Sequence, residues 1–324
     1  MKRLIFILFL IPYTAFALEC RPETKGSAEL KSQDNGIHYV VGKLSGFDPC
    51  NKSVKLSVPW SLFSSDKRKP PILIYLHGGG GLSRYGKMML EDLNREGIAT
   101  LEFDAYQMNG FNKDWKFWGF KASNASRQQM IFTVALSAYH WVKTLENVDT
   151  DRIYFYGISN GASVAVNLAG VVDKQKVKKI YAEGMPGMGL GLPDIINVPV
   201  KLIYGKLDDY GSRGPGEMIW ERTAPCFFNT VHSTAPEGNS KNCNDKKNSL
   251  SRTEKPIDWF SRMKEKHPIE IEFYEDAAHG IFLGDLQKRK STYGHSIQAN
   301  TSIGASRESK DKLFKSLVKE IRNP

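Results

Sequence analysis

The sequence predicts an α/β fold, with a mostly parallel β-sheet covered by helices on both faces. Short apolar runs alternate along the chain with longer stretches whose apolar residues recur at helical spacing. Several of these runs are continuously apolar, as expected for strands covered on both faces. The strands are predicted at Ile37–Val41, Val54–Val58, Ile72–Leu76, Ala99–Phe103, Ile153–Tyr156, Lys179–Ala182, Val200–Tyr204 and Ile269–Tyr274.

The predicted helices fall between these strands and after the last of them. They span Tyr85–Glu96, Ala125–Thr144, Ala162–Gly170, Pro256–Lys266 and Ser306–Arg322. A chain of 324 residues can bury a large core, and no fixed-period repeat divides this one. We therefore expect a single large domain over residues 18–324.

The first 17 residues have the layout of a secretory signal peptide. Residues 2 and 3 are basic, residues 4–11 are apolar, and residues 15–17 contain the small side chains of a cleavage site. The apolar run is too short to span a bilayer, and no later segment is long and apolar enough to do so. We expect an exported protein, periplasmic or extracellular, with a retained N-terminal anchor as the alternative.

Four cysteines remain after the expected cleavage, at Cys20, Cys50, Cys226 and Cys243. An even number of cysteines in an exported chain predicts disulfides. We favour the pairs Cys20–Cys50 and Cys226–Cys243, because each pair closes a local loop and the two pairs lie far apart. Four reduced thiols are the alternative. No metal site is expected, since C-x-x-C spacing is absent and no histidine lies at ligand spacing from the cysteines.

The formal net charge of +10 comes from dispersed lysines and arginines. No recognised nucleic-acid-binding motif accompanies them, so we expect no nucleic-acid partner. Scattered charge of this kind keeps a surface soluble. Attraction to anionic polymers or to membrane surfaces is the alternative.

Residues 210–254 form a polar segment that contains glycine, proline, Cys226 and Cys243. The segment is too long for a plain connection between a strand and a helix. We interpret it as a disulfide-pinned insertion before the last strand. It would act either as a lid or as a passive surface excursion.

The first chemical signal is the G-x-S-x-G pattern at residues 157–161, which has Ser159 at its centre. A predicted buried strand ends just before the pattern and a predicted helix begins just after it. A sharp turn between the two would raise the serine hydroxyl above the sheet edge, and the flanking glycines would allow close backbone approach. The pattern therefore predicts a nucleophilic serine.

The second signal is the run of glycines at residues 78–81, directly after the strand Ile72–Leu76. Backbone N–H groups of such a loop, with that of the residue after the nucleophile, can hold an oxyanion. We expect the donors at Asn160 and at Gly79 or Gly80. A phosphate loop is the rival interpretation, but the Lys-Ser/Thr of a Walker motif is missing. We interpret His77 as a structural loop residue.

A nucleophilic serine needs a base and an acid that orients the base. In hydrolases with this strand–turn–helix motif the acid and then the histidine follow the serine in the chain. Asp208 follows one predicted strand and His279 follows the next. Asp209 is the fallback acid. The remaining histidines have weaker settings, His267 before a strand and His295 in a polar tail.

Residues 104–121 are rich in aromatic side chains, including Trp115 and Trp118. The segment follows the end of a predicted strand, at the sheet edge where ligands bind in such folds. We expect the two tryptophans to line a substrate pocket. Core packing of a long loop is the equal alternative.

On these motifs the chain resembles the dienelactone-hydrolase-like branch of the α/β-hydrolase superfamily. The matching segments are residues 77–82, 157–161, 205–208 and 278–282. The resemblance covers about residues 70–204 and resumes near His279. It implies the α/β-hydrolase fold and a hydrolytic activity. Dienelactone hydrolases use a cysteine nucleophile, so Ser159 indicates a serine esterase instead.

The sequence therefore predicts an exported serine hydrolase that cleaves carboxylic esters through an acyl-enzyme, with Ser159, Asp208 and His279 as its triad. No cofactor or metal is expected. The expected partner is a small-molecule or polymer-borne ester, and the sequence ranks neither the substrate nor the oligomeric state. The alternatives are a peptidase or acyltransferase with the same triad, and an inactive hydrolase-fold protein that binds a ligand.

Overall fold

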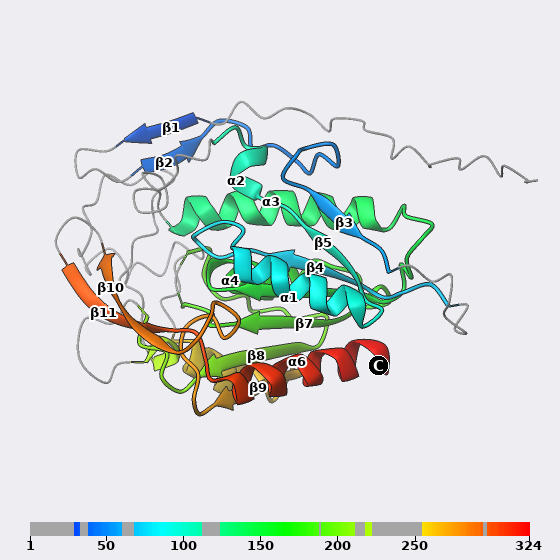
Figure 1. Cartoon of the computed structure of the whole chain (residues 1–324). Coiled ribbons are helices and arrows are strands. Elements are labelled where there is room, and N and C mark those ends of the chain that lie inside the picture. The colour runs from blue at the N-terminus through cyan, green and yellow to red at the C-terminus, as the bar shows by residue number, and fades with distance from the viewer. Residues whose placement is uncertain are drawn as a thin grey trace, which may run out of the picture.

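The computed structural model describes residues 29–32, 38–59, 68–111, 124–187, 189–210, 218–221, 255–293 and 297–324. Its centre is a seven-stranded sheet with the order β3-β5-β4-β6-β7-β8-β9 (Figure 1). β3 is antiparallel to β5, and every other neighbouring pair in this sheet is parallel. The strands are β3 (Lys55–Ser57), β4 (Ile72–Leu76), β5 (Ala99–Glu102), β6 (Ile153–Ile158), β7 (Val177–Glu183), β8 (Val200–Gly205) and β9 (Ile269–Tyr274).

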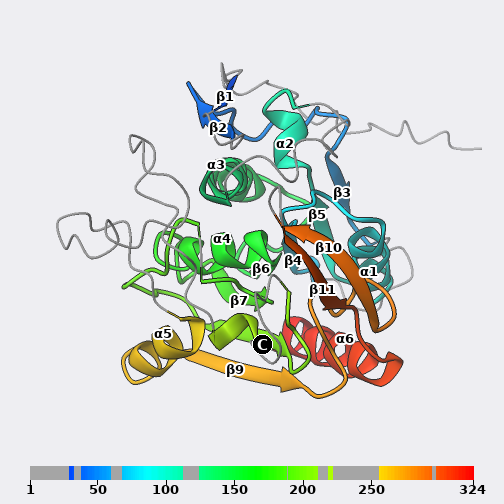
Figure 2. The ribbon, with the colours of Figure 1, turned by 90° about the vertical axis from the view of Figure 1, so that its left-hand side faces the viewer.

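Helices cover both faces of the sheet (Figure 2). α3 (Asn124–Val142), α4 (Asn160–Leu168) and α5 (Pro256–Met263) pack on one face, and α1 (Arg84–Arg95) and α6 (Arg307–Arg322) pack on the other. Successive side chains of a strand point to opposite faces, so every residue of β4 is buried, alternately in one core and in the other. The predicted fold class, a mostly parallel sheet with helices on both faces, is confirmed.

The N-terminal strand differs from the prediction. β2 (His38–Val41) pairs antiparallel with β1 (Glu29–Ser32) in a separate two-stranded sheet, so the strand predicted at residues 37–41 is no part of the central sheet. Its apolar residues resemble those of the central strands, and the pattern alone does not reveal the partner.

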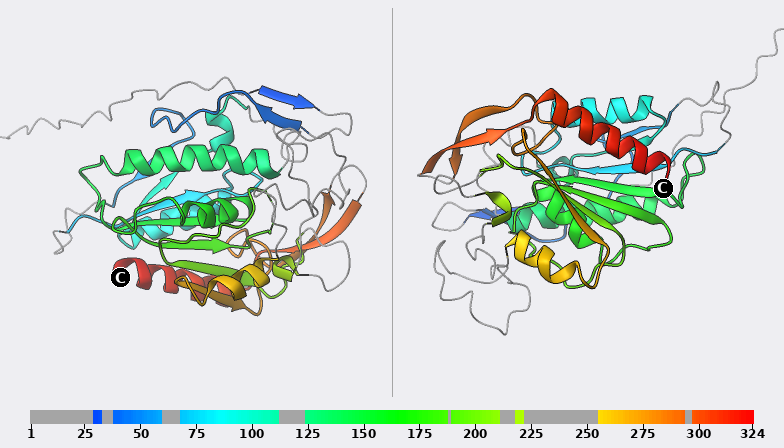
Figure 3. Two further views of the ribbon diagram at one scale, coloured as in Figure 1. Left: turned by 180° about the vertical axis from the view of Figure 1, so that it is seen from behind. Right: turned by 90° about the horizontal axis from the view of Figure 1, so that it is seen from below.

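A second hairpin was not predicted. β10 (Gln287–Tyr293) pairs antiparallel with β11 (Ile297–Ile303), and it lies beyond the end of the central sheet at which the parallel strands end (Figure 3). Three consecutive basic residues in β10, at positions 288–290, remove the apolar alternation that predicts a strand. Two further short helices lie in the described part of the chain, α2 (Ala105–Met108) and the 3-10 helix η2 (Ile219–Glu221).

Several predictions fall outside the described residues and stay predictions. They are the signal peptide at residues 1–17, most of the insertion at residues 210–254, and the cysteines at positions 20, 226 and 243. Cys50 lies within the described part of the chain and is not a free thiol. None of the helices in that part has the length and apolarity to cross a membrane.

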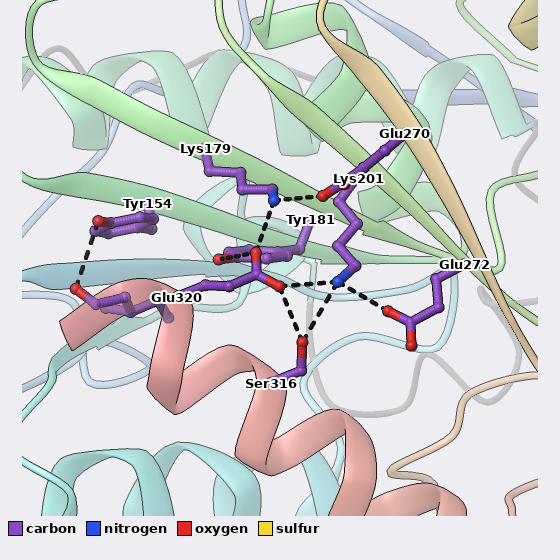
Figure 4. A network of polar contacts seen from close by, with 9 residues as sticks. Tyr154, Lys179, Tyr181, Lys201, Glu270, Glu272, Ser316 and Glu320 are labelled. Carbon is purple, nitrogen blue, oxygen red and sulfur yellow. Dashed lines mark hydrogen bonds and ion pairs between the residues drawn. The ribbon is translucent and has the colours of Figure 1, made fainter. Parts of the chain in front are cut away.

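A cluster of ion pairs fixes α6 to the sheet (Figure 4). The Nζ atom of Lys201 lies 2.8 Å from Glu320 on α6 and 2.8 Å from Glu272 on β9. Lys179 on β7 reaches the other carboxylate oxygen of Glu320 at 2.7 Å. Burial disfavours the charged form of Glu320, but the hydrogen bonds from Lys179 and Lys201 outweigh burial and lower the pKa of Glu320 to about 2.

We expect Glu320→Gln to lower the free energy of unfolding by about 2 kcal/mol at pH 7, because both lysines lose a charged partner. The pKa of Glu320 is below its usual value in the folded protein, so its ionised form stabilises the fold above about pH 4.5 and the contribution disappears as the pH falls toward about 2. Urea unfolding at pH 7 and pH 3 should therefore show a smaller difference at pH 3. Exposed Glu146→Gln is the control, and equal losses at both pH values would contradict the expectation.

Candidate active site

The predicted site residues follow the ends of four parallel strands. The glycine-rich loop follows β4, Ser159 follows β6, Asp208 follows β8, and His279 follows β9. The carboxyl ends of parallel strands meet at one edge of a sheet, which is where ligands bind in open α/β sheets. The topology therefore brings these side chains to a common edge.

Ser159 occupies a strained turn between β6 and α4. Its φ is 54° and its ψ is −117°, and it is the only non-glycine residue with positive φ in the described part of the chain. Its N–H donates to the carbonyl oxygen of Glu183 at 2.8 Å. A serine forced into this conformation between a strand and a helix presents its hydroxyl at the sheet edge.

Two glycines make this turn possible through close backbone contacts. A Cβ atom on Gly161 would lie 2.1 Å from the carbonyl oxygen of Leu76 at the end of β4. A Cβ atom on Gly157 would lie 2.2 Å from the carbonyl oxygen of Gly161. Both distances are far below van der Waals contact, so the first turn of α4 packs against β4 and β6 only without these side chains.

Asp208 and His279 form a buried pair. The Nδ1 atom of His279 lies 2.9 Å from Oδ2 of Asp208, and the two residues are 3% and 0% exposed. Because an ionised carboxylate only accepts hydrogen bonds, this contact assigns the proton to Nδ1 and leaves Nε2 free to accept one. Asp209, the fallback acid, instead accepts hydrogen bonds from the backbone and hydroxyl of Ser302.

His279 is fixed on further sides. The ring of Tyr210 stacks on its imidazole with 4.1 Å between ring centroids and 16° between planes. The carbonyl oxygen of His279 accepts from the N–H of Gly304 at 3.0 Å, beyond the end of β11. A carboxylate and an aromatic ring therefore hold the imidazole, and the chain that follows the β10–β11 hairpin holds the backbone of His279.

The turn of Ser159 lies next to this pair. Glu183, whose carbonyl oxygen binds the Ser159 N–H, is followed by Gly184. A Cβ atom on Gly184 would lie 3.0 Å from Nδ1 of His279 and 3.2 Å from Oδ2 of Asp208. The predicted nucleophile, acid and base thus surround the end of β7.

The glycine-rich loop is anchored by His77, which is fully buried. Nε2 of His77 accepts from the N–H of Ala105 at 3.1 Å, so its Nδ1 carries the proton and donates to the carbonyl oxygen of Gly78 at 2.8 Å. Both ring nitrogens therefore bind backbone groups, which is a structural role. A Cβ on Gly78 would lie 3.4 Å from the Cβ of Ser159.

Asn160 begins α4 and faces the same loop. A Cβ atom on Gly79 would lie 2.7 Å from the side-chain nitrogen of Asn160, whereas Gly80 is exposed. The side chain of Gln128 on α3 donates to Asn160 Oδ1 at 2.9 Å, and Gln128 accepts from the N–H of Leu190 at 2.7 Å. The first turn of α4, the loop and α3 are therefore fixed to one another.

The predicted pocket wall is only partly described. Trp115 and Trp118 lie outside the described residues and stay predictions. From the same aromatic segment, Tyr106 and Phe111 pack in the core with α3 and α4. Within the described residues, no group of three metal-ligating side chains occurs.

Sequence reasoning missed three residues of this site, namely Gln128, Glu183 and Tyr210. Glu183 carried a usable signal, because a charged residue directly follows the buried run of residues 180–182 at the edge where the site lies. Gln128 and Tyr210 carried no signal in sequence, because a glutamine on a helix and a tyrosine in a loop are ordinary.

No family model matches the chain, and no curated protein matches it in sequence. Solved structures are similar to it in fold. A dienelactone hydrolase from Anabaena variabilis is 14% identical over 79% of this chain and 89% of that chain, with a TM-score of 0.44. A dienelactone hydrolase-like promiscuous phosphotriesterase from metagenomic libraries is 12% identical over 92% of this chain and 98% of that chain, with a TM-score of 0.47. An acylaminoacyl peptidase from Pyrococcus horikoshii is 13% identical over 92% of this chain and 42% of that chain, with a TM-score of 0.47.

The close packing of the serine turn gives a direct test. We expect Gly161→Ala to lower the free energy of unfolding by about 3 kcal/mol or more, because the added Cβ overlaps the backbone of β4. Gly97→Ala is the control for backbone strain alone: Gly97 has a φ of 85°, but its added Cβ meets no atom within 4 Å, so a loss of about 1 kcal/mol is expected. Urea unfolding of both variants measures the difference, and equal losses would contradict the packing argument.

Proposed function

We propose that this chain is an exported serine hydrolase that cleaves carboxylic esters through an acyl-enzyme. The observation that carries the proposal is the buried 2.9 Å hydrogen bond between Asp208 and His279, beside the strained turn of Ser159. A serine hydroxyl is a weak nucleophile until an oriented base removes its proton, and a carboxylate–imidazole pair is such a base.

In the proposed reaction, Nε2 of His279 takes the proton of Ser159 as Oγ attacks the ester carbonyl carbon. The buried carboxylate of Asp208 holds the imidazole in the required tautomer and offsets the positive charge that forms on it. His279 then returns the proton to the leaving alcohol, and an acyl-enzyme remains. Water, activated by the same imidazole, releases the acid and regenerates Ser159.

The charge on the carbonyl oxygen needs preorganised donors. We assign that role to the backbone N–H of Asn160 and to the loop at residues 78–81, with Gly79 as the loop donor because it faces Asn160. The N-terminus of α4 adds a positive dipole at the same place. Export rests on the pattern of the first 17 residues, and the proposed substrate is a small-molecule or polymer-borne ester.

The triad is tested by three substitutions in the mature protein. We expect Ser159→Ala to abolish labelling by a fluorophosphonate probe and to lower kcat on p-nitrophenyl acetate by about 10⁵-fold or more. Asp208→Asn should lower kcat by about 10³- to 10⁴-fold, because the imidazole adopts the wrong tautomer. Asp209→Asn is the matched control and should stay within about threefold of wild type, since its partner is Ser302.

Two outcomes would reject the assignment. One is undiminished labelling of Ser159→Ala, and the other is equal loss of kcat in the Asp208 and Asp209 variants. A panel of p-nitrophenyl esters, feruloyl esters and peptides defines the acyl group, and cleavage of peptides alone would replace the esterase by a peptidase.

A further inference from the structure

Glu183 carries a buried carboxyl that the proposed mechanism does not use. It ends β7, and only 1% of its surface is exposed. One carboxyl oxygen accepts a hydrogen bond from the hydroxyl of Tyr156 on β6, and the other accepts from the backbone N–H of Ile281. A carboxyl is costly to bury, so a position at the sheet edge calls for a role.

The contacts of Glu183 join the nucleophile and the base. Its carbonyl oxygen binds the N–H of Ser159 at 2.8 Å, while its side chain binds Ile281, two residues after His279. Gly280, which lies between His279 and Ile281, has a φ of 70° and turns the chain sharply. Glu183 therefore binds both the turn that carries Ser159 and the loop that carries His279, and it fixes the distance between them.

The carboxyl group of Glu183 has no basic partner on a lysine or arginine among the described residues. Burial raises the pKa of Glu183 above its usual value, and the hydrogen bonds from Tyr156 and Ile281 and the nearby His279 oppose this rise without cancelling it. The titratable groups that face it are Tyr75 on β4, Tyr156 on β6, Tyr274 on β9, Asp208 and His279.

Tyr156 remains a hydrogen-bond donor. Burial, and then the charge of Glu183, raises the pKa of Tyr156 well above its usual value, so its proton stays on the hydroxyl. With the hydroxyl of Tyr156 and the N–H of Ile281 as donors, both carboxyl oxygens of Glu183 accept, which is the arrangement that its ionised form requires. The only cation that this carboxylate meets among the described titratable groups is His279 in its protonated form.

We propose that Glu183 is a second positioning residue of the base, which fixes the histidine loop and whose negative charge stabilises the imidazolium of His279. The inference rests on the proposed function. The proton moves from Oγ of Ser159 to Nε2 of His279, and no bond to Glu183 forms or breaks. Asp208 orients the ring directly, whereas Glu183 acts through the backbone of Ile281 and through its charge.

Two variants separate charge from position. Glu183→Gln keeps the size and the acceptor for Ile281 but removes the charge, and we expect kcat to fall about tenfold with KM within about twofold. The acidic limb of the pH profile of kcat/KM should move to lower pH, because the imidazolium loses a neighbouring negative charge. Glu183→Ala also releases the loop, and kcat should fall about 100-fold or more.

Glu102→Gln is the matched control. Glu102 is also a buried glutamate at the end of a strand, β5, and burial also raises its pKa, but its neighbours are Lys55, Lys87 and Glu91. The Glu102→Gln variant should leave the pH profile of kcat/KM unchanged. If the Glu183 variants fail to fold by circular dichroism, Tyr156→Phe carries the test, since it removes one donor to the carboxylate and should lower kcat with a shift in the same direction.

Labelling of wild-type Ser159 by the fluorophosphonate probe distinguishes the two proposals. If the wild type is neither labelled nor active on esters, the proposed function fails, and this inference fails with it. If the wild type is active and folded Glu183→Gln keeps its kcat and its pH profile, the proposed function stands and the role of Glu183 is overturned. A shift shared by Glu102→Gln would also overturn it.

Discussion

The turn from β6 into α4 depends on backbone groups that approach more closely than any side chain would allow. The position of Gly161 against the carbonyl oxygen of Leu76 brings the start of α4 onto the end of β4. That contact sets the conformation of Ser159, the direction of the α4 dipole and the distance from the serine to the loop that follows β4. The strained φ of Ser159 is held by the surrounding packing, because an isolated turn would relax.

The two faces of the central sheet have different chemistry. On the face toward α3 and α4 the strands contribute mostly aliphatic side chains and phenylalanine, with Tyr204 on β8, whereas on the face toward α1 and α6 four strands contribute tyrosines. Buried tyrosine hydroxyls need hydrogen-bond partners; Tyr154 donates to the carbonyl oxygen of Ile321, and acidic side chains serve Tyr181 and Tyr156. Tyr181 donates to Glu320 at 3.2 Å, and Tyr156 donates to Glu183. The same face therefore accommodates both the ion pairs of α6 and the carboxyl beside the histidine loop.

Much of the central sheet could be predicted from the sequence. The predicted bounds of β4 and β9 equal those of the structure, because each strand is bounded by residues that break the apolar pattern. The pattern failed for the two hairpins. Three basic residues remove the apolar alternation that would predict β10, and the apolar run of β2 does not show that its partner is β1. Strand pairing is a non-local property, and local residue pattern carries little of it.

The site residues divide in the same way. The sequence signal for Ser159 is local, since the G-x-S-x-G pattern supplies both glycines and the flanking residues predict the strand before it and the helix after it. The choice between Asp208 and Asp209 depends on distant segments. Asp208 meets His279, while Asp209 meets Ser302 on a hairpin that the sequence did not predict.

The position of the base is the most distributed feature of the site. His279 contacts Asp208 after β8, Tyr210 in the following loop, and Gly304 beyond β11, while the loop that carries it binds Glu183 at the end of β7. Each contact joins residues far apart in the chain, so each forms only when the whole sheet edge is assembled. A substitution in β7 or in the hairpin acts on the imidazole through these contacts, without touching the residues that the motifs identify.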